Sequence, residues 1–358
     1  MKCNNQNQRS GAIIIYAALA LFLMLIMAAI SIDVAYMQLV RTELRTATDA
    51  ASIAGAEALG RLQSRVAAVA AAKDAASLNL VARQPLVLND VDVQIGRSEQ
   101  DATGSFVFAE APLSSRRVNS VRVDGRRDET SQLGRVQLFM GGVLDTEFFA
   151  PRQQATSTST VRDIALVLDR SGSMKGKKLE DLKNSVAVFF EILGALPTNS
   201  VQCSLTSYAA DVTLDEPLTG DFAALNVAAQ GILASGLTNI GDALRGGASS
   251  IVPLDDGGTG ANARRFADRA VVLLTDGRNT AGNPPFAIPP GGTISAVEFC
   301  VRNNIPVFTI SFGANANRQE MEQIAAETGG FFRNANNGAD LQEAFREIAA
   351  RIAVTLVQ

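Results

Sequence analysis

DIALVLDRSGSMKGKKLEDLKNSVAVFFEILGAL (163–196) decides the fold of the second half of the chain. Its first part, 163–169, is a continuous apolar run that ends in Asp169, which is typical of a strand buried on both faces of a sheet. A turn-forming segment follows, and apolar residues then recur with helical spacing over 178–196. A buried strand followed by an amphipathic helix indicates a parallel sheet covered by helices.

The same alternation continues to the end of the chain. Further strands are predicted at 200–209, 270–277 and 305–313, and further helices at 318–330 and 338–358. We therefore predict an α/β domain over 161–358, built on a doubly wound, mostly parallel sheet of Rossmann-like form. In such sheets ligands bind beyond the carboxyl ends of the strands, at a topological switch point.

Oxygen-bearing side chains gather at these predicted strand ends. Two carboxylates and three hydroxyls follow strands or precede a helix, and Gly172 allows the first loop to turn tightly. Hard cations prefer such oxygen donors, so we predict a site for Mg²⁺, with Mn²⁺ or Ca²⁺ as the other candidates. The predicted ligands are Asp169, Ser171 and Ser173 in D-R-S-G-S, Thr238 in G-L-T-N-I-G, and Asp276 in T-D-G.

This five-part pattern resembles the metal-ion-dependent adhesion site (MIDAS) of von Willebrand factor A (VWA) domains. The resemblance covers about 161–358. It implies that the ion keeps one coordination position open and that a Glu or Asp carboxylate of a protein partner fills it. The alternative is a turn-rich domain that has the fold but binds no metal, because Asp-Ser-Gly runs are common turn formers.

Catalysis is the first rival function. Ser171 or Ser173 as nucleophile would need a base, and the chain contains no histidine. The remaining candidates, Lys175, Lys177 and Lys178, are expected to form a solvated charge run after the loop. We therefore expect a binding protein and not an enzyme.

Two loops are predicted to flank the same edge of the sheet. One is 255–269, before the Asp276 strand, and the other is the Pro/Gly-rich 279–293, after it. The second is long for a connection and either helps to choose the partner or is a solvated insertion. If it chooses the partner, its replacement should change partner affinity and leave metal affinity unaltered.

Composition narrows the possible partners. The net charge is −4 with no basic cluster, which argues against nucleic acid. The three cysteines have no zinc-type spacing. Cys203 lies in a predicted strand and Cys300 near the end of a predicted helix, and no disulfide is predicted between them.

The N-terminal region predicts a membrane anchor. Residues 1–10 form a short tail with Lys2 and Arg9, and residues 11–32 are apolar and uncharged, long enough to cross a bilayer. A cleavable signal would have an apolar region of only about 7–15 residues. The positive-inside rule predicts a single-pass protein of the inner (cytoplasmic) membrane, with a cytoplasmic N-terminus and its bulk in the periplasm or at the cell surface.

Residues 33–84 are predicted to form a helical stalk and residues 85–160 a small β-rich region. An apolar seam of the stalk packs either on its own domain or on a second copy or pilus component. The seam consists of Leu44, Ala47, Ala51, Ala54, Ala58, Leu62, Val66 and Val69. The predicted strands are 91–96, 104–110, 118–125, 134–141 and 153–160, the last an exposed edge strand.

The first 160 residues are similar to the TadE/TadG-like family of Tad (Flp) pilus assembly. The similarity rests on the basic tail, the single span, Asp33 just outside it, and LRTATDAA (44–51). Prepilin-like relatives carry Glu five residues after the cut glycine, whereas Tyr16 stands five residues after Gly11, so an uncut anchor is expected.

The two resemblances together imply a membrane-anchored protein of Tad-type pilus assembly or adhesion. Its extracytoplasmic VWA domain would bind an acidic protein partner through a divalent metal. The alternative function is a structural scaffold of a secretion or pilus machine, in which the metal only stabilises the fold.

Overall fold

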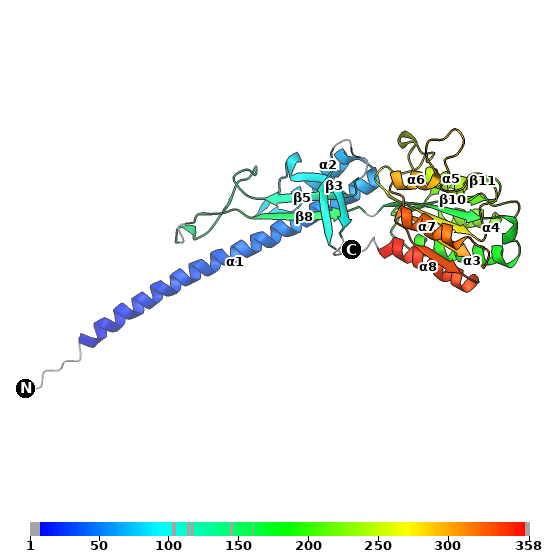
Figure 1. Cartoon of the computed structure of the whole chain (residues 1–358). Helices are drawn as coiled ribbons and strands as arrows, with labels where there is room; N and C mark the ends of the chain where they lie inside the picture. Colours follow the sequence, from blue (N-terminus) through cyan, green and yellow to red (C-terminus); the bar gives the residue numbers. More distant parts are fainter. Residues whose placement is uncertain are drawn as a thin grey trace, which may run out of the picture. The chain divides into compact units, whose positions relative to one another are not determined.

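A computed structural model describes residues 8–101, 105–112, 115, 118–143, 146–159 and 161–354 of the chain (Figure 1). The chain divides into two compact units, Met1–Ser159 (unit 1) and Thr160–Gln358 (unit 2). Each unit has a sheet and a core of its own, so each is described separately.

Unit 1 begins with one long helix, α1 (Gln8–Leu62), drawn in blue in Figure 1. From Ile13 to Met27 its large apolar side chains are mostly exposed, for example Ile14 at 69% and Leu25 at 61%. By length and composition α1 is a candidate for crossing a membrane. The first half of α1 extends beyond the sheet of unit 1, and its second half packs against it.

The helical stalk is interrupted where the sequence predicted continuity. α1 ends at Leu62, Gln63 has a φ of 51°, and α2 (Arg65–Ser77) starts afresh. The Ser64 hydroxyl caps α2 by accepting the N–H of Ala67 at 3.3 Å. A left-handed residue followed by an N-cap serine turns the chain, so the stalk is two helices packed together.

The prediction of helix up to residue 84 is wrong at its end. Strands β1 (Leu80–Val81) and β2 (Gln84–Pro85) form a small hairpin there. Its two turn residues, Ala82 and Arg83, have φ values of 53° and 65°. Such turns usually contain Asn or Gly, so the residue types at 82 and 83 do not predict this one.

The apolar seam packs on its own unit over its first half. Leu44, Ala47, Ala51 and Ala58 are buried, and a Cβ on Gly125 of the sheet would lie 2.1 Å from the Thr48 hydroxyl oxygen. The prediction of a single continuous seam is wrong beyond this point, because the chain turns at Gln63. Leu62 and Val66 are 49% and 80% exposed.

The sheet of unit 1 is antiparallel, with strand order β4-β3-β5-β8. Four of the five predicted strands are confirmed, and β8 is an edge strand with alternating burial, as expected. The fifth is wrong: 134–141 retains only β6 (Val136–Gln137), which pairs with β7 (Phe148–Phe149) outside the sheet. The confirmed strands are β3 (Val93–Gln100), β4 (Phe106–Glu110), β5 (Ser120–Arg126) and β8 (Arg152–Thr158).

Unit 2 is built on a six-stranded sheet with strand order β11-β10-β9-β12-β13-β14. Five strands are parallel, and β11 joins antiparallel to β10. The prediction of an α/β fold with a mostly parallel sheet is confirmed. The strands are β9 (Arg162–Asp169), β10 (Val201–Tyr208), β11 (Val212–Thr219), β12 (Asp268–Thr275), β13 (Val307–Phe312) and β14 (Phe332–Ala335).

Helices cover both faces of this sheet (Figure 1). One core lies under α3 (Lys177–Gly194), α4 (Phe222–Gly231) and α8 (Gly338–Val354). The other lies under α5 (Ile240–Ser250), α6 (Ala296–Arg302) and α7 (Arg318–Thr328). β11 and β14 were not predicted, because these edge strands are only partly buried and lack a continuous apolar run.

Phe345 of α8 offers a test of the first core. Its ring is fully buried and lies 5.5 Å from that of Phe189 in α3. We expect Phe345→Ala to destabilise unit 2 by about 3–5 kcal/mol, because it leaves a cavity between the two helices. Calorimetry of the full chain in detergent measures this, with Leu254→Ala, at a side chain 64% exposed, as the control. Equal melting temperatures of the Phe345→Ala and Leu254→Ala variants would contradict this packing.

Candidate metal centre

The register of β9 brings three strand ends to one edge of the sheet. Asp169, the last residue of β9, pairs with Tyr208 of β10. On the other side Leu168 pairs with Leu274 of β12, so Thr275 lies next to Asp169. Because all three strands are parallel, the loops that follow them leave from the same edge.

Asp169 is fully buried and hydrogen-bonded through both carboxylate oxygens. Oδ1 accepts the backbone N–H of Ser171 at 2.8 Å, and Oδ2 accepts the hydroxyl of Thr275 at 2.8 Å. Burial raises the pKa of Asp169 above its ordinary value, the two hydrogen bonds act in the opposite direction, and the charge of Asp276 adds to the rise. A nearby cation would favour the charged carboxylate.

A chain of hydrogen bonds joins Asp276 to the serine loop. The Ser171 and Ser173 hydroxyls are 3.0 Å apart, and Ser173 donates to Asp276 Oδ1 at 2.6 Å. Residues 172–174 form a 3₁₀ turn, and Gly172 donates its N–H to the carbonyl of Gly236 at 2.9 Å. Three of the five predicted ligands are therefore linked through their side chains, and Asp169 joins them as a fourth through the backbone N–H of Ser171.

Thr238 approaches this set from a third loop. Its hydroxyl oxygen lies 3.6 Å, and that of Ser173 4.0 Å, from the position that a Cβ on Gly277 would occupy. Both hydroxyls therefore lie close to residue 277, which directly follows Asp276. The structure thus places all five predicted residues at one edge of the sheet, in loops after β9 and β12 and before α5.

Lys178 is a residue whose role the sequence analysis misjudged. It is not part of a solvated charge run: its side chain is 34% exposed, and its ammonium lies 2.5 Å from Oδ2 of the fully buried Asp276. Lys177, by contrast, is 82% exposed and pairs with Asp181 at 3.0 Å. In the first turn of α3, Lys178 therefore points towards the site and Lys177 points away from it.

The donor set fits a hard divalent cation. It offers two buried carboxylates and at least two hydroxyls in mutual contact, all oxygen donors. A cationic side chain already sits against one of the carboxylates, as expected where negative charge is concentrated. Within the described part of the chain there is no group of three or more Asp, Glu, Cys or His side chains that could hold a metal ion.

The loop 255–269 does not flank this edge, and that prediction is wrong. Arg264 of the loop forms an ion pair with Asp163 at 2.8 Å, at the start of β9, and its guanidinium bonds the carbonyl of Arg162 at 2.5 Å. The loop precedes β12, which is parallel to β9, so it lies at the amino ends of these strands. Asp169 lies at their carboxyl ends, at the opposite edge of the sheet.

The loop 279–293 is joined to the site at its start. Thr280 accepts the N–H of Thr238 at 2.9 Å and donates its own N–H to the Thr238 carbonyl at 2.8 Å. Asn283 donates to Asp242 of α5 at 2.8 Å. The beginning of the loop thus fixes the Thr238 backbone, whereas residues 290–293 are exposed. Replacing the whole loop would disturb Thr238, so only its exposed part is free to vary.

Both described cysteines are buried free thiols remote from this chemistry. Cys203 lies in β10 and Cys300 in α6, and burial raises the pKa of the Cys300 thiol to about 12. A thiol held protonated in this way is a poor metal ligand. The described cysteines therefore pack as small apolar residues.

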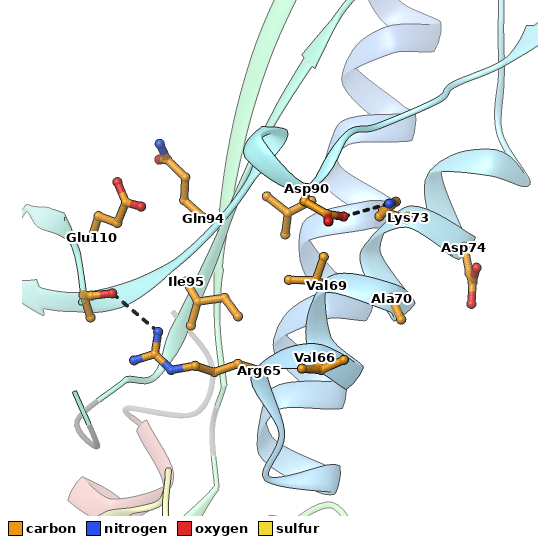
Figure 2. A pocket seen from close by; sticks show the side chains of 12 residues that line it. Arg65, Val66, Val69, Ala70, Lys73, Asp74, Asp90, Gln94, Ile95 and Glu110 are labelled. Carbon is orange, nitrogen blue, oxygen red and sulfur yellow. Dashed lines mark hydrogen bonds and ion pairs between the residues drawn. The ribbon is translucent and has the colours of Figure 1, made fainter. Parts of the chain in front are cut away.

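Unit 1 contains a groove of about 570 Å³ between α2 and β3 (Figure 2). Its floor is apolar, with Val69 and Ile95 facing each other. Three of its charged side chains have partners: Lys73 pairs with Asp90 at 2.8 Å, and Arg65 donates to the backbone carbonyls of residues 111, 112 and 115. These three groups are thus engaged with the protein and do not converge on the groove.

Comparison with known families identifies unit 2. The von Willebrand factor type A domain model matches residues 163–347, which is more than half of the chain. The chain belongs to the VWA family. The VWA fold accounts for the sheet, the helices on both of its faces and the position of the site at the carboxyl edge.

Individual relatives are distant. The chain is 27% identical over 211 residues to the human inter-alpha-trypsin inhibitor heavy chain H4, covering 56% of this chain and 21% of that protein. A solved von Willebrand factor type A protein from Catenulispora acidiphila is 16% identical, with a TM-score of 0.43, covering 65% of this chain and 45% of the other.

A second solved structure is proximal thread matrix protein 1 from the mussel byssus, whose MIDAS motif is occupied by zinc. It is 20% identical with a TM-score of 0.43 and covers 54% of this chain and 48% of the other. The chain spans only about a fifth to a quarter of the length of the curated heavy-chain relatives it matches.

The role of Lys178 can be tested by comparing its substitution with that of Lys177. We expect Lys178→Met to lower the melting temperature of the ion-free VWA unit, because the buried carboxylate of Asp276 loses a charged partner at a cost of about 1–3 kcal/mol. We also expect Mn²⁺ affinity to rise roughly tenfold, or about 1.4 kcal/mol, because the ammonium no longer competes for Asp276. Lys177→Met is the matched control. Equal Mn²⁺ affinities of the two variants in calorimetric titration would contradict the competition.

Proposed function

We propose that the VWA unit binds a divalent cation through Asp169, Ser171, Ser173, Thr238 and Asp276. The observation that carries the proposal is the hydrogen-bonded run from Ser171 through Ser173 to Asp276, which joins two separate loops beside a second buried carboxylate. Mg²⁺ is the first candidate, with Mn²⁺ and Ca²⁺ as the others, because all of these donors are oxygens.

The cation would recruit a carboxylate of a protein partner. Asp169 and Asp276 carry two negative charges, against two positive charges on the ion and one on Lys178. The ion would balance the two carboxylates, and the Lys178 ammonium that it displaces from Asp276 would add a positive charge nearby, at an edge of an otherwise acidic chain. A Glu or Asp side chain of the partner would complete the coordination and balance this charge.

We further propose binding and not catalysis at this site. The chain has no histidine, and the Lys178 ammonium bonds a carboxylate rather than a serine hydroxyl. The Ser171 and Ser173 hydroxyls are engaged with each other and with Asp276. The base that Ser173 contacts is the Asp276 carboxylate, which the Lys178 ammonium already engages, so we assign these groups to ion binding.

The proposed setting is the inner membrane, with α1 as a single-pass anchor and the VWA unit outside the cytoplasm. The exposed apolar first half of α1 supports the anchor. The sequence motifs around Asp33 and 44–51 support a role in Tad-type pilus assembly or adhesion. The acidic partner would then be a protein met in the periplasm or at the cell surface.

Titration tests the metal site. We expect Mg²⁺ and Mn²⁺ to bind the full chain in detergent and Asp169→Ala and Ser171→Ala to weaken binding at least roughly tenfold, since each removes a ligand or its support. Asp221→Ala, at the exposed N-cap of α4, is the control and should bind like the parent. A folded parent that takes up no ion would overturn the proposed function.

Chelation separates binding from scaffolding. The site carboxylates are already paired with Lys178, Thr275 and Ser173 without an ion, so the fold has no need of one. We expect EDTA to leave the circular dichroism unchanged and to lower the melting temperature only by the mass-action contribution of the ion. Unfolding on chelation would instead support the alternative function, a scaffold that the metal only stabilises.

A further inference from the structure

The hairpin of residues 136–149 in unit 1 carries exposed apolar side chains. Phe139 is 58% exposed, Met140 45% and Phe148 41%, whereas Leu138 beside them is 7% exposed. The hairpin therefore packs through Leu138 and turns three larger apolar groups outward. Large exposed apolar groups that lie together indicate a surface that something apolar covers.

Asp33 of α1 holds this hairpin in place. Its carboxylate is fully buried and accepts the backbone N–H of Phe139 at 2.9 Å and that of Met140 at 3.0 Å. The ring of Tyr36, one turn further along α1, lies 4.6 Å from the ring of Phe139. Hydrogen bonds to a buried carboxylate are strong, so Phe139 and Met140, close to the tip of the hairpin, are held at one level of the helix.

That level is where the apolar part of α1 ends. Residues 11–32 carry no charge, and at the rise of an α-helix they extend about 30 Å, the thickness of the hydrocarbon core. Asp33 follows directly. If residues 11–32 cross a bilayer, Phe139 and Met140 must lie within about one turn of the membrane surface.

The charges around the hairpin fit the same placement. The guanidinium of Arg135 lies 4.9 Å from the centre of the Phe148 ring, and that of Arg41 lies 5.2 Å from the centre of the Phe149 ring. Arg41 stands eight residues beyond Asp33, about 12 Å further from the membrane core. The arginines thus lie farther from the membrane core than the exposed aromatic side chains, just as phosphate headgroups lie farther from it than acyl chains.

We propose that Phe139 and Met140 insert into the lipid leaflet next to Asp33, as a second membrane contact beside the span. The proposal rests on the proposed membrane anchor. Lipid is the occupant because the exposed apolar surface of α1, with Met27 at 64% and Ile32 at 50%, leads directly to the tip of the hairpin. The two contacts together would fix the tilt and rotation of unit 1 against the membrane.

Tryptophan fluorescence tests this directly, since the natural chain contains no tryptophan. Three single variants of the full chain are reconstituted into phosphatidylcholine vesicles, with bromine carried either near the headgroup end or near the methyl end of the acyl chains. Phe139→Trp probes the hairpin and Phe22→Trp the middle of the proposed span. Phe106→Trp on β4, where the side chain is 50% exposed, is the matched control. β4 lies beyond the first residue of β5, whereas the hairpin follows the last residue of β5, so the two positions are at opposite ends of that strand.

We expect shallow bromines to reduce the emission of Phe139→Trp by about half and deep bromines to reduce it less, since interfacial side chains lie only about 5–10 Å deep. Phe106→Trp should stay unquenched. Quenching of Phe22→Trp without quenching of Phe139→Trp would overturn the inference and leave the anchor intact. A blue-shifted Phe139→Trp emission that neither lipid quenches would also overturn it, in favour of a protein contact. Absence of quenching at Phe22→Trp would show that the anchor itself fails.

Adding Asp33→Ala to Phe139→Trp tests the attachment of the hairpin. Without the carboxylate the tip is no longer held at the membrane level, so we expect quenching by shallow bromines to fall towards that of Phe106→Trp. Phe22→Trp with the same Asp33→Ala change should remain quenched by deep bromines, which shows that the helix still inserts. Unchanged quenching of Phe139→Trp would contradict the role given to Asp33.

Discussion

The parallel pairing of β9 with β10 on one side and β12 on the other determines the arrangement of the VWA unit. It places Asp169 level with Tyr208 and beside Thr275, in an environment closed to water. A buried aspartate lies near each end of β9, Asp163 and Asp169, but the two have different surroundings. Asp163 has the guanidinium of Arg264, whereas Asp169 has hydroxyls, an amide and a second carboxylate. The carboxyl edge alone is therefore left with surplus negative charge.

That surplus explains the position of Lys178. Two buried carboxylates close together are costly unless a cation accompanies them, and the first turn of α3 supplies one on a flexible side chain. The ammonium thus compensates the buried Asp276 carboxylate without an ion. If the proposed site binds a metal, its affinity should depend on Lys178, which is not itself a proposed ligand.

Unit 1 shows how one helix can serve two environments. The first half of α1 exposes apolar side chains, while the second half buries small residues such as Ala47 and Ala51 under the sheet. Asp33 marks the change, because its carboxylate binds the backbone of the 136–149 hairpin instead of facing solvent. A single buried carboxylate thus connects the sheet region to the end of the apolar segment.

The sequence by itself determined the class of fold, the order of the main strands and helices, and the choice of the five residues of the proposed metal site. These follow from local patterns: continuous apolar runs before Asp169 and Asp276, helical spacing after them, and oxygen-bearing residues at the strand ends. Only the tertiary structure decided which charges compensate one another. Lys177 and Lys178 are neighbours with the same chemistry, and the direction of one helical turn sends one to solvent and the other to Asp276. Likewise, the turns at Gln63 and at Ala82 depend on left-handed backbone conformations that their residue types do not signal, because packing and not local preference stabilises them.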